Sequence, residues 1–139
     1  MANELSYDRG IAVTLRFTLA NPSASATTAM TPAGAQTSNV GFVVPTGYAF
    51  HAVCMHFESN ADLTAGTIIA KVTTGGTVLA GGPQVTLSDT VQSSTAIAAV
   101  GTCKVAAAAV VGVKVVADGD YAPTTADLDV ILVGLLLPA

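Results

Sequence analysis

The chain has 139 residues, of which 51% are hydrophobic, only 10% are charged and none is Trp. Its formal net charge is −4, and its five Lys and Arg residues are scattered, which argues against a nucleic-acid surface with clustered cations. Average domains carry about 25% charged residues. We therefore expect part of the apolar excess to be buried between subunits or against a larger partner, the alternative being a monomer with a Thr-, Ser- and Ala-rich surface.

The length is typical of one domain, and we expect a single domain over residues 1–139. Residues 1–10, MANELSYDRG, form a polar lead-in with charges where a signal peptide needs its apolar segment, so export by that route is not expected. The apolar runs at 105–113 and 130–137 are far shorter than the roughly 20 residues of a membrane-spanning helix. No membrane association is expected.

The first structural signal is the segment from Ile11 to Leu19, where apolar and polar residues alternate without a fault. This pattern predicts a strand whose odd-numbered residues face a core. The next segment, 20–39, is rich in Ala, Ser and Thr and has no charge, which favours a long loop or extended arm. Met30 could anchor this segment locally; alternatively, the segment lies along a neighbouring subunit.

A short strand at 40–44 and a Pro-Thr-Gly turn lead into the apolar run 48–58, which a polar turn separates from a second strand at 67–73. We interpret these two runs as the core hairpin of the fold. Both faces of the first run are largely apolar, so we expect one face in the sandwich and the other near a subunit contact, with His51 or His56 at that boundary. Gly66 is predicted to adopt a backbone angle that a larger residue would strain.

Short strands punctuated by glycine turns follow at 77–80 and 84–88. The four alanines at 106–109 predict a turn or brief helical piece before a strand at 110–116, and Asp-Gly-Asp at 118–120 predicts another turn. The final strand, 128–137, ends apolar on both faces, so we expect its leucines to contact a partner. Because no helical period appears, the chain is predicted to be all-β, an antiparallel sandwich.

The residues that could carry chemistry form no recognisable site. Cys54 and His56 share a strand face, but two ligands do not make a metal site. We expect Cys54 and Cys103 to be free, buried thiols. The aspartates at 118, 120, 127 and 129 are expected to be solvated turn residues, because no glycine-spaced calcium loop is present. No nucleophile elbow, dinucleotide fingerprint or phosphate-binding loop occurs, so we expect neither an enzyme nor a cofactor.

The succession VVPTGYAFHAVCMHFESNADLTAGTIIAKVTTGG, followed by VVGVKVVADGDYAPTTADLDVIL, resembles the jelly-roll decoration (cement) and related head-surface proteins of tailed bacteriophages. The matching features are the Pro-x-Gly entry into a long strand, S-N-A-x-L-T-A-G before the next strand, and a late G-V-K-V strand followed by Y-A-P-T and a closing L-D-V strand. They cover a little over half of the chain. The resemblance implies a jelly-roll sandwich and a homo-oligomer, most often a trimer. It also implies synthesis in the host cytoplasm and a place on the outer surface of the virion, where such proteins bind the major capsid protein.

Two functional hypotheses follow. The first is a non-catalytic protein that stabilises a phage capsid by bridging capsomers. Its candidate oligomer or capsid contacts are Met30, His51, His56, Leu135, Leu136 and Leu137. The second is a carbohydrate- or receptor-binding module of a phage fibre or tail. Such a module requires exposed aromatic side chains, and this chain has few aromatic residues and no Trp.

Overall fold

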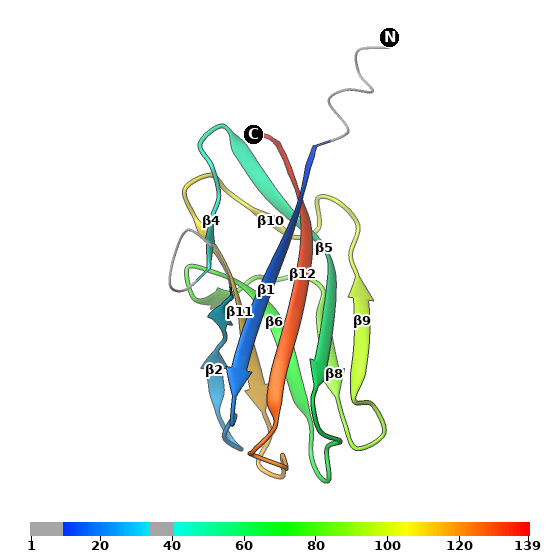
Figure 1. Ribbon diagram of the computed structural model, residues 1–139. Coiled ribbons are helices and arrows are strands. Elements are labelled where there is room, and N and C mark those ends of the chain that lie inside the picture. The colour runs from blue at the N-terminus through cyan, green and yellow to red at the C-terminus, as the bar shows by residue number, and fades with distance from the viewer. Residues whose placement is uncertain (1–9, 34–40) are drawn as a thin grey trace.

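The structure is a computed structural model that describes residues 10–33 and 41–139. Within these ranges the chain forms strands and no helix. The strands pair antiparallel throughout, in two sheets that lie one behind the other (Figure 1). The predicted all-β sandwich is confirmed. Over the same residues there is no helix of the length and hydropathy that a membrane crossing requires.

Among the described residues, each sheet contains six strands. Sheet A consists of β1 (Ile11–Ala20), β3 (Thr31–Pro32), β5 (Tyr48–Ser59), β9 (Ser93–Ile97), β10 (Lys104–Val105) and β12 (Asp127–Pro138). Sheet B consists of β2 (Thr27–Ala29), β4 (Phe42–Val43), β6 (Ile68–Thr74), β7 (Thr77–Val78), β8 (Gln84–Leu87) and β11 (Val110–Ala117).

The longer strands have the connectivity of a jelly roll. Without the two-residue strands β3, β4, β7 and β10, sheet A runs β1-β12-β5-β9 and sheet B runs β2-β11-β6-β8. Among these longer strands, β1 pairs with β12, β2 with β11, β5 with β9, and β6 with β8. The chain is thus a long two-stranded ribbon rolled into two sheets, the jelly-roll arrangement that the resemblance implied.

The predicted hairpin of the two central runs is wrong. β5 lies in sheet A, whereas β6 lies in sheet B, so the connection between them crosses from one sheet to the other. Two backbone hydrogen bonds hold this crossing to the segment after β11: Thr64 N–H donates to the Ala122 carbonyl, and Ala122 N–H donates to the Ala65 carbonyl. Strand and turn patterns predict the two strands, but they do not reveal which partner each strand takes.

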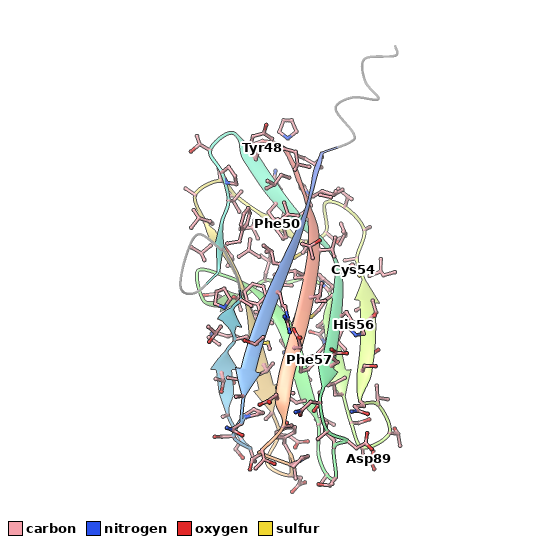
Figure 2. All side chains as sticks on the ribbon, viewed as in Figure 1. Tyr48, Phe50, Cys54, His56, Phe57 and Asp89 are labelled. Atoms are coloured by element: carbon pink, nitrogen blue, oxygen red, sulfur yellow. The ribbon has the colours of Figure 1, made fainter. Side chains whose placement is uncertain are left out.

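A β-bulge in β5 reverses the alternation predicted for this strand. Cys54 pairs with Val133 and Ala52 pairs with Gly134, so Val53 is an extra residue without a partner in β12. Even-numbered residues face the core before the bulge, and odd-numbered residues face it afterwards. The buried apolar side chains of β5 that face the core are those of Phe50, Ala52, Met55 and Phe57, of which Phe50 and Phe57 are labelled in Figure 2.

The segment predicted as a loop or arm is partly strand. β2 and β3 occupy 27–29 and 31–32 and lie in different sheets. Met30 lies between them with its side chain buried in the core, and its N–H donates to the Val113 carbonyl at 2.9 Å. The small polar residues conceal these strands from sequence patterns, because pairing with β11 and β1 stabilises them rather than burial of their own side chains. Residues 34–39 of the segment lie outside the described residues.

One apolar core fills the space between the sheets. Its largest fully buried side chains come from both sheets: Phe17, Phe50, Phe57, Met55, Leu128 and Leu132 from sheet A, and Ile68, Val72, Leu87 and Val111 from sheet B. Burying a side chain of this kind stabilises the fold by about 1.5–3 kcal/mol. The sandwich is therefore stabilised chiefly by contact between the sheets.

Gly66 has the left-handed backbone predicted for it, with φ of 71°. A Cβ atom there would overlap the Tyr121 amide nitrogen and the Asp118 carboxylate. Gly75 has a similar φ of 55° but open space around it. We expect Gly75→Ala to lower the free energy of unfolding by about 1–2 kcal/mol, the cost of the backbone angle alone. Gly66→Ala should lower the free energy of unfolding, measured by urea denaturation, by at least about 1 kcal/mol more than Gly75→Ala does. Equal losses in the two variants would show that the connection between β5 and β6 accommodates the added Cβ atom without strain.

Gly134 provides space for an aromatic ring of the neighbouring strand. A Cβ atom at this position would overlap the Phe50 ring, and it would lie 2.8 Å from the His51 carbonyl oxygen. We expect Gly134→Ala to lower the free energy of unfolding by about 1–3 kcal/mol through overpacking. Because the clash is with the ring, Phe50→Leu should lower the free energy of unfolding less in the Gly134→Ala variant than in the wild type. A double-mutant cycle measures this difference. Additive losses would contradict this account.

Candidate binding surface on sheet A

The outer face of sheet A gathers most of the residues that the sequence singled out. Because β1, β12, β5 and β9 are adjacent, their outward side chains form rows across the sheet. Taken from β1 across the sheet, the rows are Thr18, Asp129, Glu58 and Ser93; Arg16, Ile131, His56 and Thr95; Thr14, Val133, Cys54 and Ile97; and Ala12, Leu135, His51 and Lys104, the last from β10. The first two rows are mostly polar, and the last two are mostly apolar.

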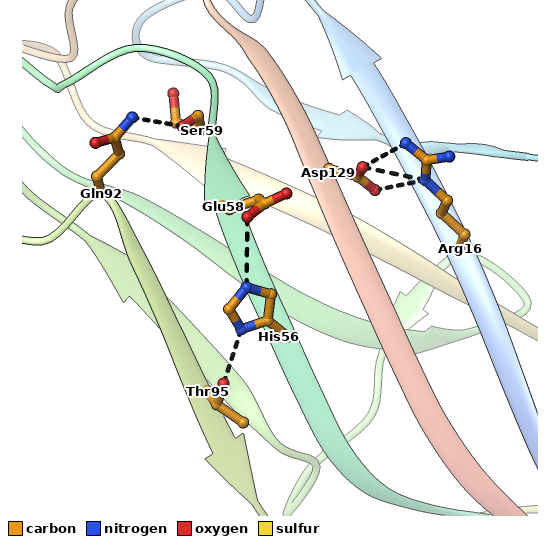
Figure 3. A network of polar contacts seen from close by, with 7 residues as sticks. All are labelled: Arg16, His56, Glu58, Ser59, Gln92, Thr95 and Asp129. Carbon is orange, nitrogen blue, oxygen red and sulfur yellow. Dashed lines mark hydrogen bonds and ion pairs between the residues drawn. The ribbon is translucent and has the colours of Figure 1, made fainter.

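The polar rows are joined by side-chain contacts between neighbouring strands (Figure 3). The Arg16 guanidinium donates from Nη2 to Asp129 Oδ2 at 2.6 Å and from Nε at 3.0 Å. The hydrogen bond and the charge of Asp129 raise the pKa of Arg16. His56 Nδ1 lies 2.8 Å from Thr95 Oγ1, and its Nε2 lies 3.6 Å from Glu58 Oε2. These exposed contacts join β1 to β12 and β5 to β9, although solvent screens the charge pairs.

An open hollow of about 530 Å³ lies beside the polar rows, between the ends of β1, β5 and β12. Both of its aspartates have side-chain partners: Asp129 Oδ2 accepts from Arg16 Nη2, and Asp127 Oδ2 accepts from Asn60 Nδ2 at 3.5 Å. Neither His56 nor its neighbour Thr95 lines the hollow. Across residues 10–33 and 41–139, no three His, Cys, Asp or Glu side chains are grouped so that they could hold a metal ion.

The apolar rows leave large side chains partly open to solvent. Ile97 is 82% exposed, Val133 and Leu135 are half-buried, and Ile131 in the neighbouring polar row is 39% exposed. His51 lies among them with only 8% exposure, and its Nδ1 atom is buried without a hydrogen-bond partner. Burial lowers the pKa of His51, and the charge of Lys104 lowers it further. The face thus contains a neutral imidazole with an unsatisfied nitrogen.

The structure brings four of the six predicted contact residues together on this face. The half-buried Leu135 and Leu137 point outward with His51 and His56, because β12 alternates regularly. Leu136 points inward and is 6% exposed, and Met30 is 2% exposed. The prediction that Leu136 and Met30 contact a partner is therefore corrected: their side chains belong to the core.

Other side chains match the sequence expectations in part. Asp118 is exposed at the turn, as expected, but its carboxylate also accepts from the Thr67 N–H and Oγ1, both at 3.0 Å, and from the Asp120 N–H. Desolvation alone would raise the pKa of Asp118, but these hydrogen bonds outweigh it and lower the pKa. Both cysteines are free thiols, as predicted; Cys103 is buried, which raises its pKa, whereas Cys54 is half-buried on the outer face.

Sequence reasoning missed Ile97 and Ile131 as surface residues. Ile97 lies in β9, a strand that no pattern predicted, because SSTAI has only one large apolar residue. Ile131 lies in a predicted strand, but its outward direction becomes apparent only when the partners of β12 are known. The Arg16–Asp129 pair likewise joins residues 113 positions apart, beyond the reach of local patterns.

Fold comparison finds this architecture in chains from two phage capsid structures. No family model matches the chain, and no curated protein matches its sequence. A chain from the acid-stable capsid structure of Helicobacter pylori bacteriophage KHP30 is similar with a TM-score of 0.51 and 12% identity, over 93% of this chain and 90% of that one. A chain from the capsid asymmetric unit of cyanophage Pam1 is similar with a TM-score of 0.52 and 15% identity, over 93% and 86%. At these identities the likeness shows the fold alone. It confirms the resemblance to phage-head proteins at the level of the fold.

His51 makes the stability of the sandwich depend on pH. Its folded pKa is lowered from an unfolded value of about 6.5, so the unfolded state binds more protons as the pH falls below 7. The free energy of unfolding should therefore decrease between about pH 7 and pH 5. Urea denaturation across this range should show a smaller decrease for His51→Gln than for the wild type or for His56→Gln. An unchanged slope in His51→Gln would contradict the assignment.

Proposed function

We propose that this protein is a non-catalytic structural component of a phage virion. In this proposal it binds the outer surface of the capsid as a homo-oligomer, expected to be a trimer, and stabilises the shell by bridging capsomers. The observation that carries the proposal is the jelly-roll likeness of nearly the whole chain to two phage capsid chains. Since a fold alone does not fix a function, the outer face of sheet A provides the second argument.

The apolar rows of this face fit a contact with another protein. Leu135, Val133 and Ile97 offer apolar area beside His51, whose pKa is lowered, and Lys104 is the single charged side chain in these two rows, so burying them desolvates one charge at most. One such contact is weak. An oligomer that presents several copies of the face to a capsid gains from effective concentration, because each further contact forms within an assembly that is already bound.

The alternative of carbohydrate or receptor binding lacks such support. It requires exposed aromatic rings on which a sugar can stack. Among the described residues, no aromatic side chain is fully exposed. Those of Phe17, Phe50, Phe57 and Tyr121 are buried, and those of Phe42 and Tyr48 are half-buried.

Capsid binding is tested with purified protein and particles of the parent phage that lack it. We expect the protein to co-sediment with the particles and to raise the temperature at which they release DNA. Leu135→Gln should weaken binding about tenfold, because a buried leucine contributes about 1.5 kcal/mol or more. The matched control is Thr86→Gln, an exposed position on the outer face of sheet B, which should bind like the wild type. Equal affinities of the two variants would exclude the apolar rows as the contact.

The oligomer is tested by light scattering coupled to size-exclusion chromatography. At micromolar concentration we expect a mass of about three chains, since the phage-head proteins that the chain resembles imply a trimer and exposed apolar surface favours association. A clean mass of one chain across the accessible concentration range would count against the proposed assembly.

A further inference from the structure

β9 forms one edge of sheet A. It pairs with β5 on one side, and over residues 10–33 and 41–139 no strand pairs with its other side. Figure 1 shows β9 at the right-hand margin of the molecule, with the ribbon of β5 on its inner side. A strand in this position presents half of its backbone hydrogen-bonding groups away from the sheet.

The register shows which backbone groups point outward. Ala98 N–H donates to the Val53 carbonyl at 2.9 Å, and Ser59 N–H donates to the Gln92 carbonyl at 3.1 Å. Even-numbered residues along β9 therefore exchange hydrogen bonds with β5. In an antiparallel ladder the N–H and C=O of one residue point to the same side, and successive residues alternate. The N–H and C=O groups pointing outward are those of Ser93, Thr95 and Ile97.

This edge lacks three of the features that normally prevent strands from pairing between molecules, namely charged side chains, Pro and bulges. The sequence SSTAI contains neither charge nor Pro, and its register with β5 is continuous. Ile97 at the end of the strand is 82% exposed, and Val100 just beyond it is 52% exposed. β9 is thus an uncharged edge with apolar side chains beside it.

We propose that β9 is a self-association edge, which pairs antiparallel with β9 of a second copy about a two-fold axis at Thr95. In this register Thr95 lies opposite Thr95, and Ser93 lies opposite Ile97. Each of these pairs brings an outward N–H of one copy to an outward C=O of the other, in both directions. The two copies of sheet A then form one continuous sheet.

A second copy fits this edge because the strand is complementary to itself. The three outward residues are spaced symmetrically about Thr95, as an isologous contact requires. No charged side chain lies on the strand, so no like charges meet across the axis. The Thr95 hydroxyl contacts His56 within its own chain at 2.8 Å, which fixes the side chain at the centre of the contact.

The pairing also has a consequence for the proposed function. Residues directly opposite each other in a ladder project their side chains to the same side of the sheet. The outer faces of both copies therefore lie on one side of the joined sheet, where both can meet one capsid surface. The β9 contact itself does not depend on the capsid-binding proposal. A two-fold contact joins copies in pairs, so in solution it links two of the proposed trimers, or two single chains if the trimer does not form.

The test is amide hydrogen exchange of the intact protein, measured by NMR at several concentrations. In the unpaired protein the amides of Ser94 and Ala96 should be protected, and those of Ser93, Thr95 and Ile97 should exchange rapidly. With increasing concentration these three amides should become protected together with a rise in sedimentation mass. Rapid exchange of the three amides at every concentration overturns the proposal, even if the protein is oligomeric through another surface.

A pair of variants isolates the contribution of the Thr95 N–H. Thr95→Pro removes this outward donor, and an edge strand tolerates Pro at a position whose N–H points away from the sheet. The variant should lose the concentration-dependent protection of the Ser93 and Ile97 amides. Thr95→Val is the matched control, because it also loses the bond to His56 but keeps the N–H and the branched shape. It should retain the protection. Equal behaviour of the two variants overturns the proposal, as does protection that arises only when capsids are added.

Discussion

The antiparallel ladder between β12 and β5 is the contact on which the rest of the molecule depends. These are the two longest strands, and they pair from Leu128 opposite Ser59 to Pro138 opposite Tyr48. β1 adds to the free side of β12, and β9 adds to the free side of β5. The ladder therefore decides which side chains of four strands share the core and which share the outer face.

A single irregularity in this ladder determines the composition of both faces. The extra residue Val53 lets Phe50 and Phe57 face the core although their positions differ by an odd number. Gly134 faces the same region, and its missing side chain leaves space for the Phe50 ring. The bulge also places His51 and His56 on the same outer face. A regular strand would have put the two histidines on opposite sides.

The sequence predicted those parts of the fold that follow from local periodicity. The alternation of 11–19 predicted β1, and the turn residues after Pro45, at Gly66 and at Asp118 were placed correctly. Local patterns do not specify which strands pair, so the predicted hairpin of β5 and β6 was wrong. The small residues of β2 and β9 likewise lack any periodic signal, because these edge strands bury little of their own surface.

The candidate surface was predictable only in part for the same reason. The apolar end of β12 indicated a contact, and Leu135 does point outward. Because side chains alternate along a strand, the adjacent Leu136 points into the core. His51 and His56 were predicted to lie near a subunit contact. Both lie on the same face only because of the β-bulge, which no residue in the sequence indicates. Arg16 and Asp129 meet only because the roll places β1 beside β12.

The rolled ribbon also sets the order in which the molecule can form. Its outermost pair, β1 with β12, joins residues more than a hundred positions apart, such as Arg16 and Asp129. Closing so large a loop costs entropy before any contact compensates for it, so jelly rolls belong to the slowly folding topologies, with times of about milliseconds to seconds. The segment between β6 and β8 is the local end of the ribbon, and it contains the short hairpin in which Thr74 of β6 pairs with Thr77 of β7. Folding that begins there and proceeds outward would complete the face of sheet A last, so a contact surface on that face would exist only on finished subunits.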